Sequence, residues 1–203
     1  MVTIIDYGVG NIQAIINIYD CLNIETRVAA SSEDLLGAKK IILPGVGSFD
    51  WVMENLNKSG MKESLCDLVL NKQVPILGIC VGMQIMANSS EEGTIPGLGW
   101  IDAKVKNFNS HDSIDGICLP HMGWNDVSPV SSNLLFLNIS NPRFYFLHSY
   151  YFSPAQSEQT LAITNYGCSF TSAVKYNNIF GVQFHPEKSH KWGIQLLNNF
   201  ALI

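Results

Sequence analysis

The sequence predicts an α/β fold in which a mixed, mainly parallel sheet is flanked by helices and antiparallel strands are inserted in the C-terminal half. In the first half, short strands that are apolar throughout alternate with helical segments, a pattern typical of parallel strands buried on both faces. In the second half, strand-like runs are separated by Gly, Asn and Pro. No repeat or linker interrupts the chain, so we expect residues 1–203 to form a single domain.

The first half contains the strands of the expected parallel sheet, at residues 2–6, 25–29, 39–45 and 74–79. A helix after the first strand is indicated by apolar residues three or four positions apart, namely Ile12, Ile15, Ile16 and Tyr19. Asn11 stands directly before them and can cap this helix. Further helical segments are expected around residues 61–69 and at residues 81–88, on either side of the fourth strand.

The second half contains the remaining expected strands, at residues 100–108, 116–120, 143–152, 161–166, 171–176 and 179–184. A last helix is expected from about residue 191 to residue 202. Three cysteines fall within helix or strand runs, so we expect small core residues at Cys21, Cys66 and Cys168.

Composition and charge exclude several classes of protein. Lys and Arg total 12 of 203 residues, form no basic run and leave a net charge of -5, so a nucleic-acid-binding role is not expected. No apolar run reaches the roughly 20 residues needed to span a membrane, and the start MVTIID does not look like a signal peptide. The 5 cysteines include no C-x-x-C pair, which favours a reducing compartment. We therefore expect a cytoplasmic protein.

Two short motifs could indicate a cofactor or metal site, and neither is complete. Gly8 and Gly10 begin a dinucleotide-binding pattern, but position 13 is Gln where the third Gly is needed. Cys118 and His121 could ligate a metal, but no second pair has suitable spacing. We expect no cofactor and no metal.

The segment around residues 74–84 carries the strongest functional signal. Its apolar strand ends in G-I-C-V-G at residues 78–82, and a helix is expected to begin at once. Such a sharp strand-to-helix turn lifts the middle side chain clear of the sheet, and the flanking glycines give the turn room. The thiol of Cys80 would lie over a helix N-terminus, where free N–H groups favour the thiolate. Cys80 is therefore the predicted nucleophile, and a buried structural cysteine is the alternative.

A nucleophilic cysteine needs a base within hydrogen-bonding reach, and His185 is the best placed of the 5 histidines. An apolar strand runs into His185, and Glu187 follows two residues later, so both side chains can project to the same side of an extended chain. Pro186 restricts the backbone between them. The carboxylate would then orient the imidazole, as in nucleophile–base–carboxylate triads. An ordinary surface turn is the alternative.

Backbone N–H groups near Cys80 can stabilise a negatively charged oxygen during such a reaction. The N–H of Val81, directly after the nucleophile, would point to where an oxyanion forms. The loop at residues 44–47 follows the third strand, and loops at the carboxyl ends of parallel strands gather at one edge of the sheet. Its glycine-rich backbone, at Val46 and Gly47, is the predicted source of a second donor, and a plain turn is the alternative.

Together, these residues resemble a known family. The runs G-I-C-V-G-M-Q at residues 78–84 and Q-F-H-P-E at residues 183–187 are similar to motifs of the class I, triad-type glutamine amidotransferases. More closely, the chain resembles the glutaminase subunits of imidazole glycerol phosphate synthases. Matching blocks run nearly end to end, at residues 6–11, 44–47, 89–93, 120–125, 145–150 and 184–189. The resemblance implies a flavodoxin-like sheet and a Cys80–His185–Glu187 triad that hydrolyses L-glutamine to glutamate and ammonia.

The resemblance also implies roles for residues outside the triad. L-glutamine would be bound by Gln84, Glu92, His148, Ser149 and Tyr150. The ammonia would pass to the cyclase subunit of the synthase, with which the chain would form a heterodimer. Because ammonia in water is mostly protonated and then a poor nucleophile, we expect the partner to cover the face that carries Cys80. The expected contact residues are Asn11, His121, Met122, Trp124, Asn125 and Lys188.

Other functions remain open at the level of sequence. Similar blocks occur in subunits that supply ammonia to sugar amidotransferases of surface-polysaccharide synthesis. A different thiol hydrolase on the same fold, such as an intracellular peptidase or a deglycase, gives no reason for Gln84 or for the block at residues 120–125. A non-catalytic binding module is disfavoured because all three triad positions hold competent residues.

Overall fold

The computed structural model describes residues 1–110 and 117–203, and a long mixed sheet forms its centre. The strands follow one another in the order β2-β1-β3-β4-β13-β12-β10-β6-β5. The parallel part consists of β1 (Val2–Ile5), β2 (Thr26–Ala29), β3 (Ile41–Gly45), β4 (Ile76–Cys80) and β13 (Ile179–Val182). All of these strands except β2 are buried along their whole length, as expected for parallel strands covered on both faces.

The antiparallel strands extend this sheet beyond β13 and add a small separate one. The extension consists of β12 (Cys168–Tyr176), β10 (Tyr150–Pro154) and β6 (Ala103–Asn107), with β11 (Thr160–Tyr166), β8 (Ser128–Pro129) and β5 (Ser89–Ser90) at its margins. In the small sheet, β7 (His121–Asp126) pairs antiparallel with β9 (Arg143–His148). The predicted fold, a mainly parallel sheet with antiparallel strands inserted in the C-terminal half, is confirmed.

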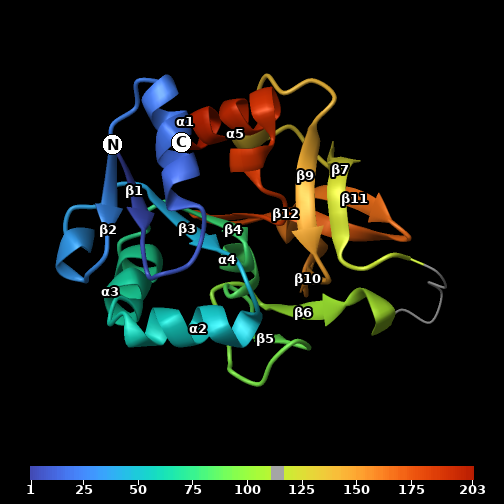
Figure 1. Ribbon diagram of the computed structural model, residues 1–203, viewed down its shortest axis with the longest axis horizontal. Helices are drawn as coiled ribbons and strands as arrows, with labels where there is room; N and C mark the ends of the chain where they lie inside the picture. Colours follow the sequence, from blue (N-terminus) through green and yellow to red (C-terminus); the bar gives the residue numbers. More distant parts are fainter. Residues whose placement is uncertain (111–116) are drawn as a thin grey trace.

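Helices cover both faces of the parallel part (Figure 1). One face carries α1 (Ile12–Cys21) and α5 (His190–Leu202), and the other carries α2 (Phe49–Lys58), α3 (Lys62–Cys66) and α4 (Val81–Gln84). The helical turns of other types are η1 (Glu33–Leu35), η2 (Asp67–Asn71), η3 (Phe108–Ser110), η4 (Leu134–Phe136), η5 (Ser157–Gln159) and η6 (Pro186–Lys188). The small β7–β9 sheet stands beside the strands of the extension (Figure 1).

Two helices differ from the sequence-based expectation. The predicted helix after Cys80 ends early, because α4 stops at Gln84 and the backbone turns there. Helix α2 was not expected, although its buried residues Phe49, Val52, Met53 and Leu56 have helical spacing. The first helix forms as predicted, but the Asn11 side chain makes no capping hydrogen bond.

The C-terminal strands differ in more ways, because their pairing is decided by distant segments. Residues 143–152 were expected to form one strand, whereas Ser149 separates β9 from β10 and these strands belong to different sheets. Strand β7 was not expected. Of the strand expected at residues 116–120, Gly116 lies outside the described residues and residues 117–120 are not in a strand. Among the predicted core cysteines, Cys21 is exposed and Cys66 and Cys168 are only half-buried.

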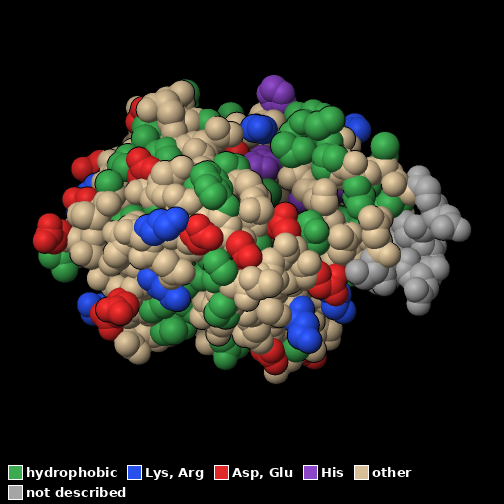
Figure 2. All heavy atoms as spheres, turned by 60° about the horizontal axis from the view of Figure 1, so that its bottom comes forward, with side chains coloured by type: hydrophobic (Ala, Val, Ile, Leu, Met, Phe, Trp, Pro, Cys, Tyr) green, Lys and Arg blue, Asp and Glu red, His purple; other side chains and the backbone are tan. Residues whose placement is uncertain are grey.

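Acidic and basic side chains are mixed on the surface (Figure 2). On the face drawn in Figure 2, basic side chains are scattered among acidic ones and form no continuous basic area. Within residues 1–110 and 117–203, no helix is long and apolar enough to cross a membrane.

Candidate active site

Cys80 occupies a strained turn at the carboxyl edge of the parallel sheet. It is the last residue of β4 and precedes α4 directly, with φ 55° and ψ -114°. Residues other than glycine rarely adopt a positive φ of this kind, and such backbone strain is typical of nucleophile elbows. Gly82 makes the turn possible, since a Cβ at this position would lie 2.0 Å from the carbonyl oxygen of Leu43 in β3. The start of α4 therefore packs directly on the neighbouring strand, which holds the thiol at the edge of the sheet.

His185 and Glu187 lie beside Cys80 because β13 is the neighbour of β4 in the sheet. The His185 Nδ1 atom is 2.8 Å from Glu187 Oε1, and both side chains are almost fully buried. Burial alone would lower the pKa of His185. The charge and hydrogen bond of Cys80, together with those of Glu187, outweigh burial and raise this pKa to about 10. The three predicted catalytic side chains are therefore brought together.

Strand β9 lies next to Cys80 and His185, and hydrogen bonds connect it to the segment around His185. The backbone N–H of His185 donates to the Tyr145 carbonyl at 2.9 Å, and the Cys80 thiol faces the Leu147 carbonyl at 3.9 Å. The Ser189 hydroxyl donates to the His185 carbonyl at 2.6 Å and accepts from the Tyr145 N–H at 3.0 Å. The small sheet is thus anchored to the segment that carries His185.

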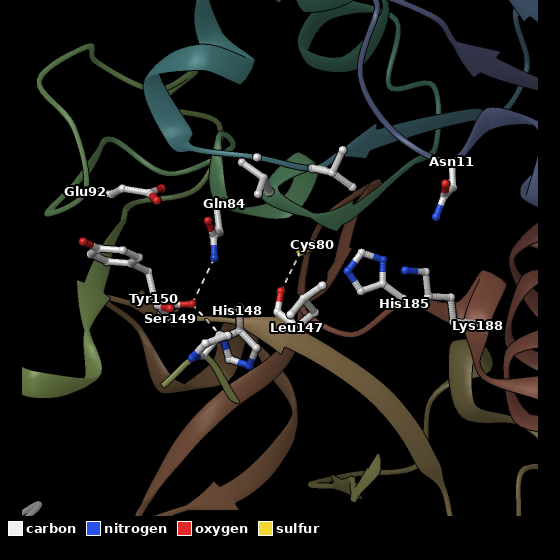
Figure 3. A pocket seen from close by; sticks show the side chains of 14 residues that line it. Asn11, Cys80, Gln84, Glu92, Leu147, His148, Ser149, Tyr150, His185 and Lys188 are labelled. Atoms are coloured by element: carbon white, nitrogen blue, oxygen red, sulfur yellow. Dashed lines mark hydrogen bonds between the residues drawn. The ribbon is translucent and has the colours of Figure 1, made fainter. Parts of the chain in front are cut away.

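A pocket of about 500 Å³ opens beside Cys80. All predicted catalytic, oxyanion and substrate-binding residues line it except Glu187, which lies behind His185. In Figure 3, Cys80 and His185 are at one end, and Gln84, Glu92 and Tyr150 are at the other. The predicted oxyanion loop also reaches the pocket, because Gly45 is the register partner of Cys80 and is followed by Val46 and Gly47.

The Glu92 carboxyl group provides a negative group at the end of the pocket far from His185. Its Oε2 atom accepts a 2.8 Å hydrogen bond from the backbone N–H of Phe49, the first residue of α2. Burial raises the pKa of this carboxyl group, the Phe49 hydrogen bond opposes that rise, and the charge of Asp50 adds to it.

Within the described residues, no cluster of three or more His, Cys, Asp or Glu side chains could hold a metal ion.

The Gln84 side chain lines the pocket, but its nitrogen atom is directed into the protein. Nε2 donates to the Tyr150 carbonyl at 3.0 Å and to Gln183 Oε1 at 3.1 Å. Gln183, which the sequence did not single out, then directs its own Nε2 toward the sulfur of Cys80 at 3.8 Å. In the sequence, Gln183 is the first residue of the Q-F-H-P-E run and a polar residue in an otherwise apolar strand, but no role was assigned to it.

The predicted partner-contact residues fall into two groups. Met122, Trp124 and Lys188 are exposed. Lys188 lines the pocket, Met122 is the register partner of Leu147, which also lines it, and Trp124 lies further along β7, stacked on His190 with 5.3 Å between ring centroids. Asn11 is also exposed, and its side chain approaches Glu187 at 3.5 Å.

The second group points inward, which corrects the expectation. His121 is only 3% exposed, with its ring stacked between Phe146 and Tyr166. Asn125 is half-buried and hydrogen-bonds to the His121 ring and to the Asn165 carbonyl. In the alternation along β7 these two residues occupy the inner face, opposite Met122 and Trp124, so their side chains are not available to a partner.

The fold and the site together define a class of protein. The family model for glutamine amidotransferase class-I matches residues 3–203, and the chain belongs to this family. It is 54% identical over 204 residues to "Imidazole glycerol phosphate synthase subunit HisH" of Bdellovibrio bacteriovorus, covering 100% of both chains. It is 52% identical to the subunit of the same name from Leptospira interrogans, covering 99% of each. Among solved structures, PurLQS from Thermotoga maritima superposes with a TM-score of 0.73 at 16% identity, over 99% of this chain and 97% of the other, which shows a shared fold.

Proposed function

We propose that this chain is the glutaminase subunit of an imidazole glycerol phosphate synthase and supplies ammonia for histidine biosynthesis. The observation that carries the proposal is the arrangement of Cys80, His185 and Glu187 beside a pocket of about 500 Å³, in a chain whose relatives bear that name along their full length. The proposal treats residues 1–203 as one domain. It places the protein in the cytoplasm, where the 5 free cysteines would stay reduced.

The reaction follows from the positions of the three side chains. The Cys80 thiolate attacks the side-chain amide carbon of glutamine, and the carbonyl oxygen becomes an oxyanion. The His185 imidazolium, oriented by Glu187, then gives its proton to the leaving nitrogen, so that ammonia departs and a thioester remains. His185 next takes a proton from a water molecule that attacks the thioester. This step releases glutamate and restores the thiolate, so the sum is glutamine plus water to glutamate plus ammonia.

The oxyanion would be stabilised by backbone N–H groups at the sheet edge. The start of α4 gives the N–H of Val81, and the glycine-rich loop after β3 gives Val46 and Gly47. Donors that are already in place need no rearrangement as the negative charge develops. The close packing of Gly82 on Leu43 supports this role, because it keeps the two donor segments together.

Recognition of glutamine would use the polar end of the pocket. The substrate ammonium group can pair with the Glu92 carboxylate, and the backbone of His148, Ser149 and Tyr150 can bind its carboxylate or amide. We assign Gln84 mainly to supporting this wall, because its nitrogen is already bound to Tyr150 and Gln183.

The cyclase subunit would dock over the mouth of the pocket. Met122 and Leu147 are register partners in the β7–β9 sheet and are 65% and 38% exposed, so they form an apolar area next to Cys80. Trp124 adds an aromatic side chain of the kind that often dominates interfaces. Exposed Lys188 can pair with an acidic group, and Asn11 lies at the same rim.

A coupled assay tests the partner and the chemistry separately. Trp124→Ala and Lys188→Ala should weaken cyclase binding and glutamine-driven product formation, while product formation driven by ammonium salt survives. Lys72→Ala is the matched control, because Lys72 is an exposed lysine just before β4, at the opposite edge of the sheet. Unchanged binding and activity in both variants would exclude this docking surface. Absence of glutamate release from glutamine, with or without the cyclase, would exclude the glutaminase.

A further inference from the structure

The side chains of two buried histidines beside the pocket have no role in the proposed chemistry. His121 in β7 and His148 in β9 are register partners in the small sheet, and they are 3% and 6% exposed. The Nδ1 atom of His121 lies 3.0 Å from the Nε2 atom of His148. At this distance one nitrogen must donate a hydrogen and the other must accept it.

Backbone groups at both ends determine which nitrogen donates. At the inner end, His148 Nδ1 lies 2.8 Å from the Tyr150 carbonyl, which can only accept, so this nitrogen carries a hydrogen. At the outer end, Asn125 Nδ2 faces the Asn165 carbonyl at 2.9 Å, and Asn125 Oδ1 accepts from the N–H of Asp126 at 2.8 Å. The Asn125 amide therefore has a defined orientation, with its second N–H directed to His121 Nε2 at 3.2 Å.

Only one distribution of hydrogens between neutral rings satisfies all these contacts. Asn125 donates to His121, His121 Nδ1 donates to His148, and His148 Nδ1 donates to Tyr150. A second proton on either ring would set two N–H groups against each other. Burial lowers the pKa of His121 to about 4, and burial is also the main reason that the pKa of His148 falls to about 3. Both rings are thus neutral at the pH of the cytoplasm.

The chain of hydrogen bonds ends at the turn where the backbone leaves the small sheet for the main sheet. Tyr150 is the first residue of β10, and its carbonyl also accepts from Gln84 Nε2 at 3.0 Å (Figure 3). His148, Ser149 and Tyr150 all line the pocket next to Cys80. We propose that His121, supported by Asn125, is a positioning residue that holds the His148–Tyr150 turn in the shape needed to bind glutamine. The substrate named here rests on the proposed function.

The first test needs no variant. Nitrogen NMR of the wild-type imidazoles should show His121 and His148 as neutral rings protonated at Nδ1, the less common tautomer, between pH 6 and 8. A His121 ring protonated at Nε2, or one that titrates near 6.5, would overturn the proposal.

The second test separates positioning from general stability. His121→Phe keeps an aromatic ring between Phe146 and Tyr166 but removes the donor to His148. We expect KM for glutamine to rise about tenfold, as for the loss of one buried hydrogen bond, with kcat changed less than about threefold. Alkylation of Cys80 by iodoacetamide should keep its wild-type rate. His121→Asn, which restores an N–H close to the position of Nδ1, should recover part of the lost affinity.

Tyr166→Phe is the matched control, since it keeps the ring that stacks on His121 and loses only a hydroxyl bound to the Cys118 carbonyl. It should retain wild-type KM. An unchanged KM in His121→Phe, or equal losses of kcat and Cys80 alkylation, would contradict a positioning role. If His121→Phe does not fold, the tautomers measured in the wild-type protein decide whether His121 donates to His148. If the wild-type protein releases no glutamate, the proposed function is wrong. The NMR measurement of the His121 and His148 tautomers still tests the hydrogen-bond chain in that case.

Discussion

The edge of the parallel sheet and the small β7–β9 sheet hold their functional residues by different means. At the parallel edge, Cys80 is positioned by backbone packing, with Gly82 against Leu43 and Gly45 in register with Cys80. In the small sheet, the wall of the pocket is held by side-chain hydrogen bonds that run through His121 and His148. The reacting atoms are therefore built into the core. The substrate-binding wall depends on a polar network that can be weakened without disturbing the core.

The largest expected effect is on the nucleophile, and it should leave the fold intact. Cys80→Ala should reduce glutamate release at least roughly 10⁴-fold, because no other group can form the thioester. Circular dichroism and the unfolding temperature should change little. A diazo-ketone analogue of glutamine should label Cys80 and spare the exposed thiols of Cys21 and Cys118. Labelling at Cys118, or activity in the Ala variant, would disprove the assignment.

The base and its carboxylate should differ in importance. His185→Ala should remove nearly all activity, roughly 10³-fold or more, because the imidazole transfers protons in both half-reactions. Glu187→Gln should leave a measurable remainder, since the amide can still accept a hydrogen bond from Nδ1 although it has lost its charge. Steady-state glutamate release at saturating glutamine compares the two. Equal losses would show that the charge of Glu187 is as important as the base itself.

Backbone packing at the parallel edge can be tested through Gly82. An alanine Cβ would lie 2.0 Å from the Leu43 carbonyl oxygen, so Gly82→Ala should lower the free energy of unfolding by about 3 kcal/mol or more. Glutaminase activity should fall with it, because Cys80 would move. Gly60→Ala is the control, since a Cβ there meets nothing within 4 Å and only the positive φ opposes it, at about 1 kcal/mol. Similar urea midpoints for both variants would argue against the packing account.

The smallest effect concerns pH and the small sheet. The pKa of His121 in the folded protein, about 4, lies below its ordinary value of 6.5, so the folded state binds fewer protons than the unfolded state between these values. The stability linked to this group is present above pH 6.5 and is lost as pH falls toward 4. It contributes a slope of up to about 1.4 kcal/mol per pH unit.

In His121→Phe, the decline in unfolding free energy between pH 6.5 and 4 should therefore be shallower than in the wild-type protein. Urea unfolding at a series of pH values measures both slopes, and Tyr166→Phe should keep the wild-type slope. Parallel curves for wild type and His121→Phe would mean that His121 titrates normally, and would contradict the hydrogen-bonded arrangement of neutral rings in the small sheet.

Local sequence alone determined the parts of the molecule that depend on neighbours in the chain. The apolar strands β1, β3 and β4 and the elbow at Cys80 follow from spacing within a few residues. His185 and Glu187 also meet, but Glu187 lies in the helical turn η6 and not in the extended chain that was expected. Tertiary structure alone decided which residues meet across long separations. Gln84 contacts Gln183 from 99 positions away, and the inward direction of His121 follows from the pairing of β7 with β9. Strand register determines such contacts, and a shift of one residue would turn His121 outward and Met122 inward, so composition and spacing could not predict them.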